Sequence, residues 1–193
     1  MLIFMERRNF IKKALYTATG LVVVGGGATG FFHYHFSDRN HAKRILNFSN
    51  LQEALNELDR IEKAAELQIA GDWSLYQNLI HCTQSIEFSL LGYPENKPAL
   101  FQKTIGKLVF HKFEGQGYMR HNRNEPIPKA PEIIKNGDLK EAFTKLRKTI
   151  SDFEKFQGNL APHFAYGQLS KVEYTKAHAF HLADHFSAMD YKI

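Results

Sequence analysis

The sequence predicts an all-α protein, a bundle of four helices, or up to five, with one long crossover loop. Apolar residues recur at three- and four-residue steps through most of the chain after residue 48, which is the spacing of one helix face. No run in that region shows sustained strand alternation. Three prolines, Pro126, Pro128 and Pro131, interrupt regular structure before the last helices. We therefore expect helices packed around one core.

Two helices are predicted in the first half of the bundle. Ser49 or Asn50 can cap a helix that runs to about residue 65. Asp72 can cap a second helix over residues 73–91, and the Gly-Tyr-Pro sequence that follows is a stop signal. Both segments carry apolar side chains along one face, so both are expected to pack against the core.

Three further helices complete the prediction. Residues 98–113 fit a helix with proline in its first turn, followed by an irregular connection of about 20 residues. A fourth helix is expected over residues 138–156. Ser170 and Glu173 have the spacing of a capping box, which predicts a final helix to about residue 189.

Residues 1–36 are predicted to be an export address, and residues 37–193 the helical domain. The sequence Arg-Arg-Asn-Phe-Ile-Lys, residues 7–12, resembles the twin-arginine export motif, and a mildly apolar, glycine-interrupted stretch follows it. The alternative is an uncleaved transmembrane helix, since about 20 apolar residues can span a bilayer. The resemblance implies export by the twin-arginine machinery, to the periplasm or to an anchored position on the inner membrane. With either kind of segment, the domain from about residue 37 is expected to face the periplasm or the outside.

Charge and cysteine content exclude several kinds of site. The formal net charge is +5, but three of these charges lie before residue 37, and the rest of the chain has no dense basic run, so nucleic-acid binding is not expected. Cys82 is the single cysteine, which excludes an intramolecular disulfide and a cysteine-rich zinc site. A transition-metal site must therefore be built from histidine and carboxylate.

The histidines of the final predicted helix indicate such a site. His178, His181 and His185 lie within an arc of about 60° on one helix face. His181 and His185 are one turn apart, the spacing at which two imidazoles reach a single ion. Two ligands hold zinc, nickel or iron poorly, so a third is expected from another helix, and His81 is the candidate. One ion can bridge them only if the His81 ring lies within about 8 Å of the other two.

Structural interpretations compete with this one. A lone buried His81 is more often a hydrogen-bonded core residue. His178 shares the stripe but lies nearly two turns from the last histidine, and His163 either approaches the site or packs its ring in a loop. No general base is evident: Glu87 is rotated by about 240° from His81, and Asp184 by about 100° from its neighbouring histidine. Both carboxylates are expected in solvent or behind the ligands.

Two local sequences carry a resemblance to a known family. One is Gly-Asp-Trp-Ser-Leu-Tyr-Gln-Asn-Leu-Ile-His, which ends at His81, and the other is Pro-His-Phe-Ala-Tyr-Gly-Gln-Leu-Ser, residues 162–170. With them, residues 51–189 resemble the DinB-like (YfiT-like) superfamily of metalloenzymes, in particular an uncharacterised branch whose members often carry export signals. The resemblance implies a four-helix bundle, His81, His181 and His185 as metal ligands, and a homodimer as one possible assembly.

The resemblance and the ligand set together imply a metal-dependent enzyme, either a hydrolase or a thiol-dependent transferase, acting on a small molecule. Three neutral imidazoles would leave a zinc, nickel or iron ion its full charge, so a bound water or thiol would lose its proton near neutral pH. The alternative is a non-catalytic exported bundle that binds a metal or ligand, with a closed site completed by His178 or His163. A haem bundle is a third possibility, although no Cys-x-x-Cys-His sequence is present for covalent attachment.

Overall fold

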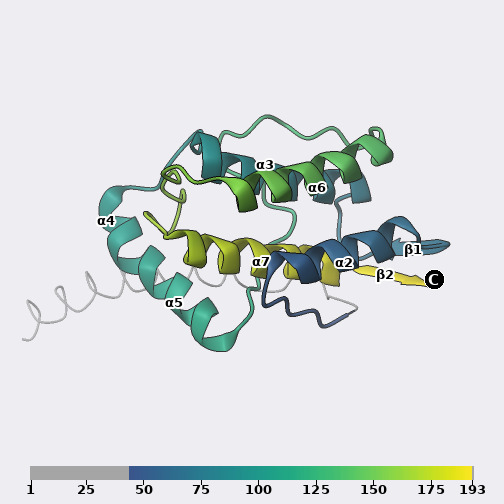
Figure 1. The fold of residues 1–193 in the computed structure, drawn as a ribbon, viewed down its shortest axis with the longest axis horizontal. Coiled ribbons are helices and arrows are strands. Elements are labelled where there is room, and N and C mark those ends of the chain that lie inside the picture. Colours follow the sequence, from purple (N-terminus) through teal and green to yellow (C-terminus); the bar gives the residue numbers. More distant parts are fainter. Residues whose placement is uncertain (1–43, 193) are drawn as a thin grey trace, which may run out of the picture. The chain divides into compact units, whose positions relative to one another are not determined.

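The computed structural model describes residues 44–192, and most of these residues are helical (Figure 1). The prediction of a mostly helical chain is confirmed, whereas the predicted export address lies outside the described residues. The elements in chain order are α2 (Leu51–Glu62), β1 (Glu66–Ile69), α3 (Leu75–Leu91), α4 (Ala99–Phe101), the π-helix η1 (Gln102–Gly106), α5 (Lys107–Gln116), α6 (Leu139–Lys155), α7 (Lys171–Ser187) and β2 (Met189–Lys192).

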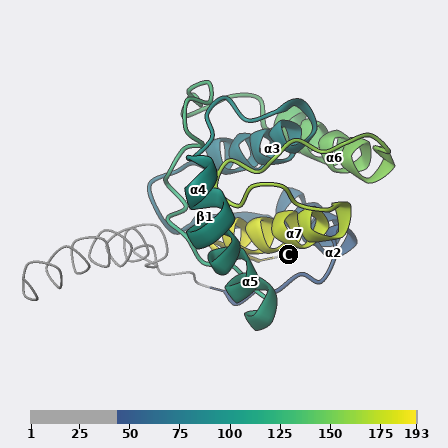
Figure 2. The ribbon, with the colours of Figure 1, turned by 90° about the vertical axis from the view of Figure 1, so that its left-hand side faces the viewer.

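The four long helices pack as two layers. Helix α3 lies along α6, and α2 lies along α7, and the two pairs face each other in both Figure 1 and Figure 2. Contacts of α3 with α7 and of α2 with α6 join the layers. Fully buried aliphatic and aromatic side chains fill the space between them, among them Leu58, Leu79, Leu146, Ile150 and Phe186. The core therefore lies between the two helix pairs, as the apolar faces require.

Most helix starts follow the predicted caps. The side chains of Asn50 and Asp138 accept the backbone N–H three residues on, and Ser170 forms the predicted capping box. Helix α3 is different, because its cap is Ser74, in a capping box with Gln77, and not Asp72. Trp73 consequently lies before the helix and not within it.

A long connection without helix or strand, residues 117–138, joins α5 to α6, as predicted; we call it the crossover segment. Side chains of α3 hold it to the bundle through its backbone carbonyls. Gln84 Nε2 donates to the oxygen of Pro131 at 3.1 Å, and Gln77 Nε2 to that of Ile133 at 3.3 Å. Such side-chain donors satisfy carbonyls that have no partner in a ladder.

The two short strands were not predicted. Strand β1 pairs antiparallel with β2, in a register that sets Glu66 opposite Lys192. The final helix therefore ends at Ser187, two residues earlier than expected, and the chain turns back as a strand. Buried Glu57 of α2 supports this strand, because it accepts a hydrogen bond from the Tyr191 hydroxyl at 2.9 Å and pairs with Arg44 at 2.6 Å.

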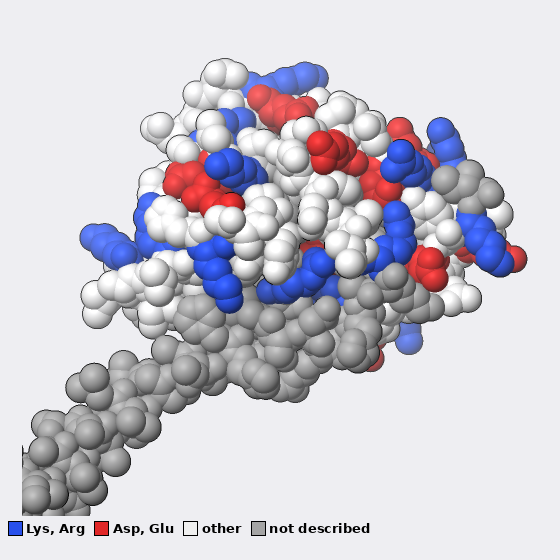
Figure 3. Space-filling view, turned by 90° about the horizontal axis from the view of Figure 1, so that it is seen from below, with Lys and Arg blue, Asp and Glu red and all other residues white. Residues whose placement is uncertain are grey.

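No helix among residues 44–192 is long and apolar enough to cross a bilayer. On the face in Figure 3, basic and acidic side chains are interspersed over the described part of the surface. The two-layer arrangement leaves α3 and α7 adjacent, and the histidines of these two helices meet there.

Candidate metal centre

Four histidines converge where α3, α7 and the crossover segment meet. His81 belongs to α3, His181 and His185 to α7, and His121 to the crossover segment. Each offers one ring nitrogen, and these four nitrogens all lie within 4.8 Å of one another. We refer to these residues as the histidine cluster.

The three histidines singled out in the sequence are brought together. The His81 ring centroid lies 5.1 Å from that of His181 and 4.8 Å from that of His185, well inside the separation that one ion can bridge. Nε2 of His81 is 3.2 Å from Nε2 of His181. Two nitrogens bound tetrahedrally to one ion at about 2.0 Å lie about 3.3 Å apart, so this pair already has the spacing of two ligands.

Asn78 sets the orientation of the His185 ring. Its amide nitrogen donates to the carbonyl oxygens of Trp73, at 3.3 Å, and Ser74, at 2.9 Å, so its Oδ1 is left to accept. That Oδ1 lies 2.8 Å from Nδ1 of His185. Nδ1 must therefore carry the ring proton, and the lone pair of His185 lies on Nε2, as a metal ligand requires.

Asp184 sets the orientation of the His121 ring. Its Oδ2 lies 2.7 Å from Nδ1 of His121, and its Oδ1 accepts from Arg120 at 3.1 Å and from Arg123 at 3.2 Å. Burial alone would raise the pKa of Asp184, but the hydrogen bond from His121 and the positive charges around it outweigh burial and lower that pKa. An ionised carboxylate only accepts, so Nδ1 of the His121 ring carries a proton, and in the neutral tautomer with this proton the lone pair lies on Nε2.

Several buried ring nitrogens of the cluster have no hydrogen-bond partner. Within residues 44–192, the buried ring nitrogens that have no hydrogen-bond partner are Nδ1 of His81, Nε2 of His121 and Nε2 of His185. An unsatisfied buried polar atom costs about 1–3 kcal/mol, and a metal ion would remove that cost at the two Nε2 atoms. Burial lowers the pKa of His81 to about 3, with a further contribution from His121, and also lowers the pKa values of His181 and His185. The rings are therefore neutral, the form that binds metals.

Trp73 packs against two rings of the cluster. Its ring meets that of His81 edge to face, with centroids 4.9 Å apart, and stacks on that of His185 at 6.3 Å. This contact depends on the start of α3 at Leu75, because the preceding residues are then free to fold over the site. An apolar ring at this place shields the nitrogens from water.

The other candidate histidines lie outside the cluster. Nε2 of His178 is 3.1 Å from the Ser89 hydroxyl, and its ring stacks on Tyr174. Nδ1 of His163 accepts the backbone N–H groups of Ala165 and Tyr166, which holds its loop in shape. Both residues are therefore hydrogen-bonded histidines of the fold, and neither completes the histidine cluster.

Of the two carboxylates considered, only Asp184 adjoins the cluster. Glu87 points away and pairs with Lys145 of α6 at 3.3 Å. His121, which sequence reasoning missed, takes the place expected for His178 or His163. His121 lies in an irregular segment, so no helical spacing could predict which way its side chain points. The only signal in the local sequence is that this histidine lies between two arginines, Arg120 and Arg123.

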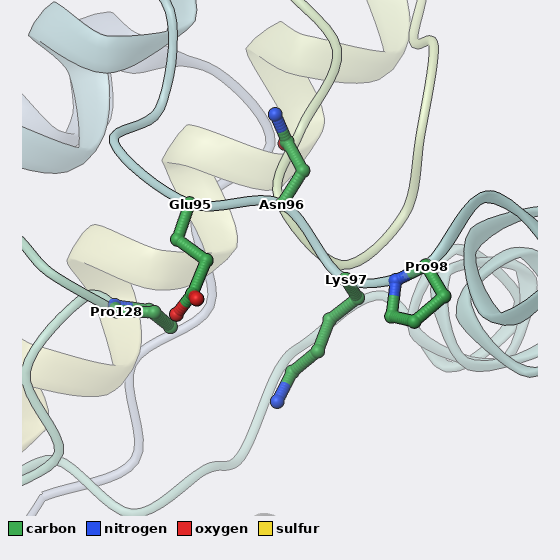
Figure 4. A pocket seen from close by; sticks show the side chains of 5 residues that line it. All are labelled: Glu95, Asn96, Lys97, Pro98 and Pro128. Atoms are coloured by element: carbon green, nitrogen blue, oxygen red, sulfur yellow. The ribbon is translucent and has the colours of Figure 1, made fainter.

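A separate surface pocket lies beside the connection between α3 and α4 (Figure 4). Its lining residues are Glu95, Asn96, Lys97, Pro98 and Pro128. Glu95 is about half exposed and pairs with Lys129 at 3.2 Å. This hollow contains no member of the histidine cluster.

The family comparison matches the domain that holds the cluster. The family described as protein of unknown function (DUF1569) matches residues 40–192, which is most of the chain. The chain belongs to this family. No curated protein and no solved structure matches it. All four members of the histidine cluster lie inside the matched range, so the cluster belongs to the DUF1569 domain.

Proposed function

We propose that this DUF1569 protein binds one divalent metal ion, zinc, nickel or iron, through His81, His181 and His185, and uses it in a hydrolase or thiol-dependent transferase reaction on a small molecule. The observation that carries the proposal is the convergence of the cluster's nitrogens within 4.8 Å, with Nε2 of His185 buried and unpaired. The packing of α3, α6, α2 and α7 supports a four-helix bundle of the DinB-like type with one long crossover.

The chemistry follows from the charge of the ligands. Imidazole is a donor that suits zinc, nickel and iron, and neutral imidazoles cancel none of the ion's charge. Such an ion lowers the pKa of a bound water or thiol and polarises a carbonyl or similar electrophile. The buried position beside Trp73 strengthens these effects, because nearby water would otherwise screen them.

A second candidate is a non-catalytic metal-binding bundle, and His121 is the observation that favours it. A fourth nitrogen within the same 4.8 Å would close a tetrahedral site. A closed site of this kind stabilises a fold without offering a position for substrate. The two candidates differ in whether an added small ligand can reach the ion.

Metal analysis of the purified protein tests the proposal. Wild type should contain about one equivalent of metal per chain, and His181→Ala should retain clearly less after dialysis, since it removes one of the three ligands that the helices fix in place. His111→Ala is the matched control, because this histidine is exposed on α5. Equal metal content in wild type and His181→Ala would refute the site. If azide or a thiol changes the visible spectrum of the Co²⁺-substituted protein, the ion is accessible, which favours the enzyme. An unchanged spectrum favours the closed metal-binding bundle.

A further inference from the structure

We infer that His121 is a displaceable fourth ligand, carried by the crossover segment and held by Asp184, and that an incoming anion or thiolate takes its place on the ion. The inference rests on the proposed function, since it needs an ion at the cluster. A site closed by four histidine nitrogens could then still react with a small molecule, because one of the four ligands can leave the ion.

The four histidines differ in what holds their backbones. His81 lies within α3, and His181 and His185 lie within α7, so helical hydrogen bonds fix three of them. His121 belongs to a segment without helix or strand, and its side chain is 19% exposed, whereas His185 is fully buried. Movement of His121 therefore disturbs the least structure.

Asp184 holds His121 in place at two points. Its Oδ2 accepts the ring Nδ1–H at 2.7 Å and the backbone N–H of the same residue at 3.3 Å. These two contacts aim Nε2 at the cluster, where it is buried and has no partner. A carboxylate behind a histidine is the usual support of a metal ligand.

The same carboxylate keeps the segment attached when the ring moves. Arg120 and Arg123 both donate to Oδ1 of Asp184, and Asn124 donates to Asp72 at 2.8 Å. These contacts do not involve the His121 ring. The ring can therefore leave the ion by side-chain rotation while the segment stays on α7, and the ion would gain an open position where the partly exposed His121 had been.

Co²⁺-loaded full-length protein provides the test, with azide and free imidazole as probes. His121→Ala should retain one Co²⁺ per chain but show an altered visible spectrum, and it should bind azide about tenfold more tightly than wild type, because no ligand has to be displaced. Free imidazole should restore the wild-type spectrum. Asp184→Asn, which retains His121 but weakens its support, should shift azide affinity in the same direction.

The outcomes separate this inference from the proposed function. His111→Ala, an exposed histidine substitution, should behave as wild type in every measurement. If His181→Ala loses Co²⁺ while His121→Ala keeps the wild-type spectrum and azide affinity, His121 is not a ligand and only this inference fails. If wild type itself takes up no Co²⁺, both proposals fail.

Discussion

Oδ1 of Asn78 lies 2.8 Å from Nδ1 of His185, with the Asn78 amide nitrogen already committed to two backbone carbonyls. The asparagine can only accept from the histidine, so it selects the tautomer whose Nε2 faces the cluster. An uncharged residue of α3 thereby orients the ring that we propose as a ligand on α7, and it does so without an ion.

Asn78→Ala is expected to weaken metal binding about tenfold to a hundredfold, the usual cost of removing a partner behind a ligand. Competition with a chromophoric chelator measures the effect. Asn56→Ala, on the exposed face of α2, is the matched control and should leave affinity unchanged. An Asn78→Ala protein with wild-type affinity would show that the hydrogen bond does not orient the ring.

Acid should destabilise the protein through histidines that lie outside the cluster. Burial, with a contribution from the charge of Lys171, lowers the pKa of His178 to about 3, and burial and His178 lower that of His163 to about 3. Between the ordinary pKa of about 6.5 and about 3, the unfolded chain binds these protons and the folded chain does not. Stability is therefore complete above about pH 6.5 and declines as the pH falls towards 3.

His178→Gln should remove one such proton. In chelator-treated protein, the slope of unfolding free energy against pH between 4 and 6 should fall by roughly 1 kcal/mol per pH unit. Urea unfolding at several pH values measures this slope. An unaltered slope in His178→Gln would mean that the buried ring is protonated in the folded state.

Gly106, in the π-helix η1, is expected to tolerate no side chain. A Cβ there would collide with the carbonyl oxygen of Ala165, in the loop that precedes α7. Because backbone has to move, Gly106→Ala should destabilise the protein by about 1–3 kcal/mol. Gly115→Ala in α5, where a Cβ meets nothing within 4 Å, should instead stabilise it by about 0.5–1 kcal/mol. Thermal unfolding compares the two, and a stable Gly106→Ala protein would contradict the close approach.

Glu57 should contribute more to stability than a surface acid. It is buried in α2 and contacts Arg44, Arg60 and Tyr191. Glu57→Ala leaves the Tyr191 hydroxyl and the partly buried Arg44 without this partner, so a loss of about 2 kcal/mol is expected. Denaturant unfolding measures the loss. Glu53, another acid of α2, is unsuitable as a control because it supports the helix cap. Asp152→Ala, at an exposed pair on α6, serves instead and should change stability by less than about 1 kcal/mol.

Local rules predicted the long helices because each carries its own signals. Asn50, Asp138 and Ser170 begin their helices as the capping pattern indicates, and the apolar faces that follow turn to the core. The strands depend on a partner more than 100 residues away. Neither four-residue strand shows a pattern that separates it from a loop, since strand preference is largely a matter of context.

In the histidine cluster, too, local sequence predicted some members, whereas others depend on contacts between distant parts of the chain. His181 and His185 could be placed from helical spacing, and His81 from its position among apolar residues on another helix. His121 could not, because its location depends on the contacts of an irregular segment with Asp184. Asp184 was recognised only as a residue rotated away from the ligands, and that rotation is what directs it towards the crossover segment.

The position of Trp73 allows metal binding at the cluster to be followed by intrinsic tryptophan fluorescence. It is the only tryptophan in the chain, and its ring touches those of His81 and His185. Intrinsic fluorescence excited at the indole band therefore arises beside the cluster, and paramagnetic ions such as Co²⁺ or Ni²⁺ arriving there should quench it. Occupancy can be followed in the unlabelled protein, by stopped flow or plate reader, without an added dye.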